Sequence, residues 1–264
     1  SSGLLSLPQI SLIRFQALVL LMVFGNVCPE SRWVLHFCAM TKHCLAFGVL
    51  WIACGLAFAQ TEDKAASASP YTLEVTTEVA HQPGLTKYLI SVKLPEGDRV
   101  SSVYGTDVHP LTVRAPKGVF NSPYNGSWSA SGMNPKFFEI MPDMADDTYA
   151  TIGLSTAAKM SGMEGAEDPT MVQDPGSPWD EFFTESGETD LDISTHTGGA
   201  YFVLRTAANG AGQDGKVFLM QVTTEGDLSG AINLQLFPAS GEHDQVRCRF
   251  EFNGKGEFPG LAIE

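Results

Sequence analysis

Cysteine is scarce in this sequence and unevenly distributed. Only 5 of the 264 residues are cysteine, and four of them lie within the first 54 residues, which leaves Cys248 alone in the rest of the chain. A single cysteine cannot form an internal disulfide, so residues 60–264 must be held together by their own hydrophobic core. Cys248 lies in an apolar–polar alternation from Val246 to Phe252, and we expect it to be a buried, unreactive thiol.

Positive charge is also scarce. The chain has 16 Lys and Arg against 30 Asp and Glu, for a net charge of −14 at pH 7. Removing residues 1–59, for the reasons given below, takes away three basic residues and one acidic residue and makes the net charge −16. Binding to nucleic acid requires a basic surface that faces the phosphates, so the composition excludes nucleic acid as a partner.

Catalytic and metal-binding motifs are missing as well. No G-x-S-x-G elbow is present, and the serines of residues 127–131 lack an identifiable base. Gly210, Gly212 and Gly215 match G-x-G-x-x-G, but a β-patterned run follows them, whereas a phosphate-binding loop requires a helix. No two of the four histidines beyond residue 59 have metal-ligand spacing; these are His81, His109, His196 and His243. We therefore predict that the protein is not an enzyme.

No hydrophobic run is long enough to span a membrane comfortably. Residues 40–59 instead have the form of a secretory signal peptide, with a basic start, an apolar segment at 44–58 and a small-x-small cleavage signal. We expect cleavage after Ala59, no membrane span in the mature chain, and a secreted location, either extracellular or at the cell surface. Residues 1–39 are interpreted as upstream translated sequence or a mis-assigned start, because Met40 is the first methionine that precedes a proper signal.

Two alternatives to secretion by this signal stay open. Residues 17–24 are a possible membrane anchor, but the run is short and stops at Gly25. Lipid attachment at Cys54 is the other alternative, and Trp51 fits poorly the position that begins such a signal. Both rank below plain secretion.

The remaining chain is dominated by β patterns. Residues 60–70 are small and polar, which predicts a disordered leader. Residues 71–80 and 86–94 alternate between apolar and polar side chains around a Pro-Gly turn, which predicts a hairpin. Further short strands are predicted at residues 100–104, 111–114, 201–204 and 245–252.

Residues 216–237 contain the clearest pair of strand patterns. Two apolar runs flank Glu225–Leu228, and a turn at Gly226 and Asp227 would place Val217 opposite Leu236. One face of that hairpin would be nearly all apolar, as expected for a ribbon with one side on a core. The predicted fold is all-β, an antiparallel β-sandwich of two sheets that covers residues 71–258.

Aromatic residues are interspersed in a polar loop at residues 115–133. Their rings could form a platform for a sugar or another ligand, or they could fold inward and anchor the loop. We favour anchoring because large apolar side chains resist exposure. The candidate ligand-binding residues, if a platform exists, are Tyr124 and Trp128 in this loop and Trp179 in the next one.

An acidic insert follows at residues 155–194, with Lys159 as its only basic residue. Long irregular segments inside a domain tend to be functional or mobile. Calcium is the one cofactor for which the sequence offers ligands, because it requires several carboxylate and carbonyl oxygens. The candidate calcium ligands are Asp180, Glu181, Asp190 and Asp192. No D-x-D-x-D-G loop is present, so solvated surface charge is the favoured interpretation.

Several segments of this chain resemble secreted β-rich modules of marine microbes. The similarity is carried by residues 197–204, 216–226 and 228–237, together with residues 102–105 and 149–153. It covers most of residues 71–258. That family has no assigned activity, so the resemblance implies an extracellular location and transfers no catalytic residues.

The sequence therefore favours a secreted, non-catalytic module that acts in a matrix, in adhesion or in ligand binding. Its expected partner is an extracellular glycan or protein. The alternative is a carbohydrate-binding domain or a secreted glycoside-active enzyme, because paired carboxylates are plentiful.

Overall fold

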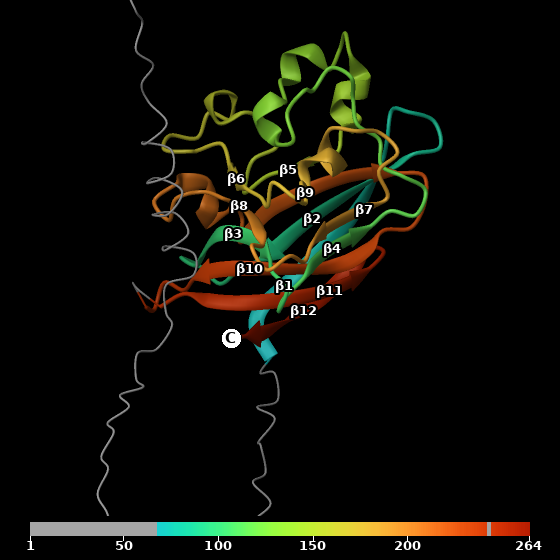
Figure 1. Ribbon diagram of the computed structural model, residues 1–264. Coiled ribbons are helices and arrows are strands. Elements are labelled where there is room, and N and C mark those ends of the chain that lie inside the picture. Colours follow the sequence, from blue (N-terminus) through green and yellow to red (C-terminus); the bar gives the residue numbers. More distant parts are fainter. Residues whose placement is uncertain (1–67, 242–243) are drawn as a thin grey trace, which may run out of the picture. The chain divides into compact units, whose positions relative to one another are not determined.

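The computed structural model describes residues 68–241 and 244–264. The predicted N-terminal extension and signal peptide lie outside the described residues, as does most of the predicted leader. The described chain forms an all-β unit whose strands are connected by loops and short 3-10 helices (Figure 1). No helix in this part of the chain is both long and apolar enough to cross a lipid bilayer.

Every strand pairing in the described chain is antiparallel. The strands are β1 (Ala68–Val79), β2 (Thr86–Lys93), β3 (Arg99–Gly105), β4 (Leu111–Arg114), β5 (Tyr149–Ala150), β6 (Thr170–Val172), β7 (Asp190–Ile193), β8 (Gly199–Phe202), β9 (Lys216–Thr224), β10 (Ser229–Phe237), β11 (Val246–Asn253) and β12 (Gly256–Ile263). The 3-10 helices are η1 (Ala130–Gly132), η2 (Pro135–Phe137), η3 (Pro142–Asp146), η4 (Ala158–Met160), η5 (Asp180–Phe183) and η6 (Ala208–Ala211).

The strands form one continuous sheet in the order β5-β9-β2-β1-β12-β11-β10-β3-β8-β6, with β4 paired to β10 and β7 paired to β4. The sheet curls so that strands from its two ends share a core (Figure 1). Tyr201 on β8 shows this directly, because its hydroxyl donates a hydrogen bond of 3.0 Å to the Leu219 carbonyl on β9. The all-β, antiparallel class is confirmed, whereas the predicted division into two sheets is replaced by a single curled sheet.

The β1–β2 hairpin is confirmed. Its register runs from Thr72 opposite Lys93 to Val79 opposite Thr86. Apolar residues on one face of β1 and β2, among them Leu73 and Ile90, are fully buried in the core. Alternation of apolar and polar residues was therefore a sufficient signal here.

The predicted hairpin at residues 216–237 is wrong in its pairing, although both strands exist. β9 pairs with β2 and β5, while β10 pairs with β11, β3 and β4. Most residues of β9 and β10 are buried, on both faces of each strand. A strand that is apolar on both faces can pair with several partners, so its pattern does not identify the neighbour.

The Gly-rich loop before β9 has the backbone expected of a turn. Gly212 and Gly215 have φ angles of 71° and 73°, in the left-handed region that favours glycine. A strand, β9, follows directly. The loop therefore lacks the helix that a phosphate-binding motif requires, as predicted.

Cys248 on β11 is fully buried, as expected from the alternation of its strand. Burial raises the pKa of its thiol. A thiol with a raised pKa carries little thiolate at neutral pH, which agrees with a structural, unreactive residue.

Candidate functional site

Two of the three predicted ligand-binding aromatics pack against the core, where Trp179 is buried and Trp128 is partly buried. Trp128 and Trp179 meet edge to face with 5.6 Å between ring centroids, and both lie about 6 Å from the ring of Tyr201. The indole N–H of Trp179 donates to the Val172 carbonyl. These contacts support the anchoring interpretation. Tyr124 is different, because it is 52% exposed.

The predicted calcium ligands are divided between two places. Asp190 and Asp192 lie on β7 and flank Arg114 on β4, at 3.1 Å and 2.7 Å from its guanidinium nitrogens. Asp180 begins η5, where its carboxylate accepts from the Gln173 side chain, and the next residue, Glu181, is exposed.

Arg114 therefore occupies the position between Asp190 and Asp192 that the prediction gave to a cation. Within the ranges that the structure describes, no group of three or more His, Cys, Asp or Glu side chains is placed to hold a metal ion. Calcium binding stays a prediction without structural support.

Two consecutive acids that the sequence did not single out hold the loops together. Asp146 and Asp147 end η3, and both are fully buried. The carboxylate of Asp146 accepts from the backbone N–H of Gln82 at 2.8 Å and lies 3.1 Å from Nδ1 of His81. It therefore fixes the turn between β1 and β2.

Asp147 fixes the aromatic loop of residues 115–133. Its two oxygens accept from the backbone N–H of Ser122 and from the side-chain amide of Asn125, each at 2.6 Å. Burial raises the pKa of the Asp147 carboxyl to about 7, although these two donors oppose the shift. Asn125 begins an Asn-Gly-Ser glycosylation sequon, and this bond turns its amide inward, so the folded chain does not present it.

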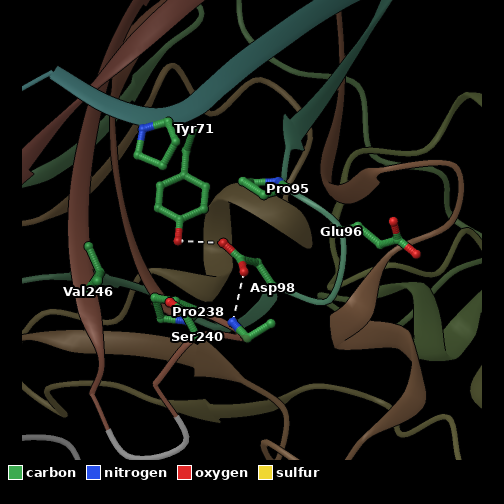
Figure 2. A pocket seen from close by; sticks show the side chains of 9 residues that line it. Tyr71, Pro95, Glu96, Asp98, Pro238, Ser240 and Val246 are labelled. Carbon is green, nitrogen blue, oxygen red and sulfur yellow. Dashed lines mark hydrogen bonds between the residues drawn. The ribbon is translucent and has the colours of Figure 1, made fainter.

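A pocket lies where β1, the β2–β3 turn and the β10–β11 connection meet (Figure 2). We call it the Tyr71–Asp98 pocket. Its volume is about 470 Å³. Its lining residues are Pro70, Tyr71, Pro95, Glu96, Asp98, Pro238, Ala239, Ser240 and Val246.

The polar groups of this pocket are fixed by hydrogen bonds. Asp98 is only 7% exposed. One of its oxygens accepts from the Tyr71 hydroxyl at 2.8 Å, and the other accepts from the backbone N–H of Ala239 at 2.8 Å (Figure 2). Burial and the neighbouring Asp98 carboxylate raise the pKa of Tyr71, so its hydroxyl stays a donor at neutral pH.

The walls of the Tyr71–Asp98 pocket are mostly apolar. Three prolines and Val246 contribute rings and methyl groups, while Glu96 and Asp98 are the charged residues of the lining. Among the described residues of the lining, none is basic and none is a histidine or a cysteine. Such a hollow suits a ligand with an apolar body and a hydrogen-bond donor or positive charge that faces Asp98.

Sequence reasoning missed this pocket because its parts are far apart in the chain. Tyr71 belongs to a strand alternation and Asp98 to a Pro-Glu-Gly-Asp turn, and each has a sufficient local explanation. They meet only because the curled sheet brings β1 beside the β2–β3 turn. No signal in the sequence connects them to residues 238–246.

The chain matches no protein-family model, no curated protein and no solved structure.

Proposed function

We propose that the chain is an exported, non-catalytic binding module that takes a small ligand in the Tyr71–Asp98 pocket. The observation that carries this proposal is a hollow of about 470 Å³ with apolar walls and a buried, hydrogen-bonded carboxylate. Pockets for small ligands typically have volumes of roughly 300–1,000 Å³ and combine apolar walls with a few fixed polar groups. The proposed secretion rests on the sequence pattern of residues 40–59.

The chemistry of the lining narrows the ligand class. Glu96 and Asp98 bring negative charge, and no basic side chain among the described lining residues balances it. Each carboxylate oxygen of Asp98 accepts one protein hydrogen bond and has a further lone pair. The ligand we expect is therefore an apolar molecule that carries an amine.

A non-catalytic role is supported by the surroundings of the histidines that the structure describes. His81 and His196 each bond a carboxylate, Asp146 and Asp107 respectively, and His109 bonds a backbone carbonyl. The three serines of the aromatic loop hydrogen-bond to one another. General-base activation of a nucleophile requires the base within hydrogen-bond reach of it, and none of these contacts has that form.

The carbohydrate-binding alternative has less support than the pocket. Trp128 and Trp179 pack against each other and against Tyr201, which leaves Tyr124 as the exposed ring among the three candidates. Binding on a glycan array that disappears in Tyr124→Ala would favour this alternative over the pocket.

Calorimetric titration with hexylamine and with hexanol tests the proposed function. We expect the wild-type chain to bind hexylamine, and Val246→Trp to abolish binding because the indole fills the hollow. Val108→Trp is the matched control, because Val108 is 74% exposed and does not line the pocket. The proposal would be contradicted if neither hexylamine nor hexanol bound to the wild-type chain. It would also be contradicted if the two tryptophan variants bound hexylamine equally well. Amino-terminal sequencing of exported protein tests secretion, with Gln60 as the expected first residue.

A further inference from the structure

The sheet has a polar face on β3, β10 and β11, on the side opposite to the core. Two rows of side chains cross these three strands and form what we call the polar sheet face. From β3 through β10 to β11, its members are Ser102, Gln235 and Arg247 in one row and Tyr104, Asn233 and Arg249 in the other. The intervening residues Val103, Leu234 and Cys248 are fully buried in the core. Successive residues of a strand point to opposite sides, so the two rows share the outer side.

Arginine is concentrated around this face. Four of the five arginines in the described chain lie on it or beside it, namely Arg99, Arg205, Arg247 and Arg249. Arg99 is the register partner of Phe237, and the guanidinium of Arg205 lies 5.6 Å from the centre of the Phe237 ring. In a chain with a net charge of −14, four guanidinium groups are therefore concentrated around one face of the sheet. Glu251 offsets part of it, at 3.3 Å from Nε of Arg249.

Two hydroxyl groups of the polar sheet face are buried without a partner. Neither the Oγ of Ser102 nor the hydroxyl of Tyr104 has a hydrogen bond, although the residues are only 2% and 7% exposed. Buried polar atoms are nearly always paired in folded proteins, and an exception calls for a water, an ion or a functional role. Burial raises the pKa of Tyr104 to about 12, while Arg247 and Arg249 lower it, so the hydroxyl stays protonated and close to both charges.

The other members of the face are held in place by hydrogen bonds. The Asn233 amide donates to the carbonyls of Tyr104, His109 and Pro110 at 2.8–3.3 Å. Arg249 donates through Nη1 to the Asn233 oxygen and to the Pro110 carbonyl, and Gln235 donates to Gln245. Groups fixed in this way bind a ligand with little loss of side-chain entropy.

We propose that the polar sheet face binds an oxyanion, which accepts hydrogen bonds from the hydroxyls of Ser102 and Tyr104 and is balanced by the guanidinium groups of Arg247 and Arg249. Arginine presents donors in a plane that matches carboxylate, sulfate and phosphate oxygens, and hydrogen bonds between charged partners are the strong ones. This site shares no residue with the Tyr71–Asp98 pocket, whose charged residues are acids. It therefore takes a ligand of the opposite charge, and the proposal for this site does not depend on the proposal for the pocket.

Titration calorimetry of the chain with sodium sulfate, and separately with sodium acetate, tests this proposal at constant ionic strength. We expect the wild type to bind at least one of the two anions. Tyr104→Phe and Ser102→Ala each remove one donor and none of the hydrogen bonds given above, and we expect each to weaken binding about tenfold. Arg247→Gln removes charge and should weaken it at least as much. Preference for sulfate indicates a tetrahedral group, and preference for acetate a carboxylate.

Arg114→Gln is the matched control, because Arg114 pairs with Asp190 and Asp192 on β7 and lies opposite Ser229, four residues along β10 from Asn233. We expect it to bind the anion as the wild type does. Sulfate also stabilises proteins generally by exclusion from their surface, and that effect does not distinguish variants. Absence of binding by both anions, or equal affinity in the wild type and the three face variants, would overturn the proposal.

Discussion

The Tyr71–Asp98 pocket and the polar sheet face each contain a buried tyrosine hydroxyl, and the two hydroxyls have opposite surroundings. The Tyr71 hydroxyl donates to a carboxylate at 2.8 Å, whereas that of Tyr104 has no partner. The same group should therefore stabilise the fold in one place and destabilise it in the other, because a buried polar atom must replace its lost hydrogen bonds to water. A hydroxyl that stabilises needs no further explanation, and one that destabilises suggests an interaction outside the folded chain.

The largest effect is expected at the acceptor of the pocket. Asp98→Ala leaves both the Tyr71 hydroxyl and the Ala239 N–H without their acceptor. We expect the free energy of unfolding to fall by about 3 kcal/mol, because two buried hydrogen bonds to a charged group are lost together. Urea denaturation followed by fluorescence measures this. Asp98→Asn retains an acceptor and should cost less. A loss below about 1 kcal/mol for the alanine variant would show that the pocket is not held by these bonds.

Asp147, like Asp98, is a buried carboxylate that accepts hydrogen bonds, but its contribution to stability should depend on pH. Burial raises the pKa of its carboxyl from the ordinary value of 3.8 to about 7 in the folded chain. The folded state therefore holds a proton that the unfolded state has lost, so the free energy of unfolding is highest at low pH and falls as the pH rises to 7. Between pH 5.5 and 8 the expected decrease is about 2 kcal/mol.

Denaturation midpoints at these two pH values test that prediction. Asp147→Asn cannot titrate, so we expect its stability to change much less over the same interval. The carboxyls whose pKa is lowered, such as those of Glu74 and Asp107, stay ionised in this range and do not obscure the comparison. Stability that increases from pH 5.5 to pH 8 in the wild type would contradict the assignment of a raised pKa to Asp147.

Tyr71→Phe isolates the partnered hydroxyl. It removes the donor to Asp98 and leaves the ring in place, and we expect a loss of about 1.5 kcal/mol because the acceptor is charged. Tyr201→Phe is the matched control, because it removes a hydrogen bond to the neutral Leu219 carbonyl and should cost about 1 kcal/mol. If the wild type and Tyr71→Phe were equally stable, the Tyr71 hydroxyl would not stabilise the fold, and its expected difference from the Tyr104 hydroxyl would disappear.

Local structure was predictable from the sequence for the longer strands with one polar face, whereas the short strand β7 in the acidic insert was not predicted. The β1–β2 hairpin follows from alternation around a Pro-Gly turn. The partners of β9 and β10 do not, because these strands are buried on both faces. β12 escaped prediction because Gly256, Pro259 and Gly260 interrupt its pattern, although it lies between β1 and β11. Gly260 is required there, since a Cβ would come within 2.6 Å of the Phe250 ring.

The candidate sites were less predictable, for a related reason. Each depends on which strands are neighbours, and that choice is made by the core of the whole sheet. Asp190 and Asp192 were interpreted as cation ligands because Arg114, 76 residues before Asp190, was not known to lie on the paired strand. Ser102 and Arg247 likewise share a row only through β10. The sequence shows which residue types are present, but it does not show which of them lie side by side on neighbouring strands.

The smallest expected effect is also the most informative about the polar sheet face. In buffer without oxyanions, Tyr104→Phe removes a buried hydroxyl that has no hydrogen bond and retains the ring. We expect stability to be unchanged or to rise by up to about 1 kcal/mol, because the unsatisfied group no longer has to be desolvated. Urea denaturation beside Tyr71→Phe measures the difference. A loss as large as that of Tyr71→Phe would mean that the Tyr104 hydroxyl already has a stabilising partner, and the argument for a ligand there would lose its main support.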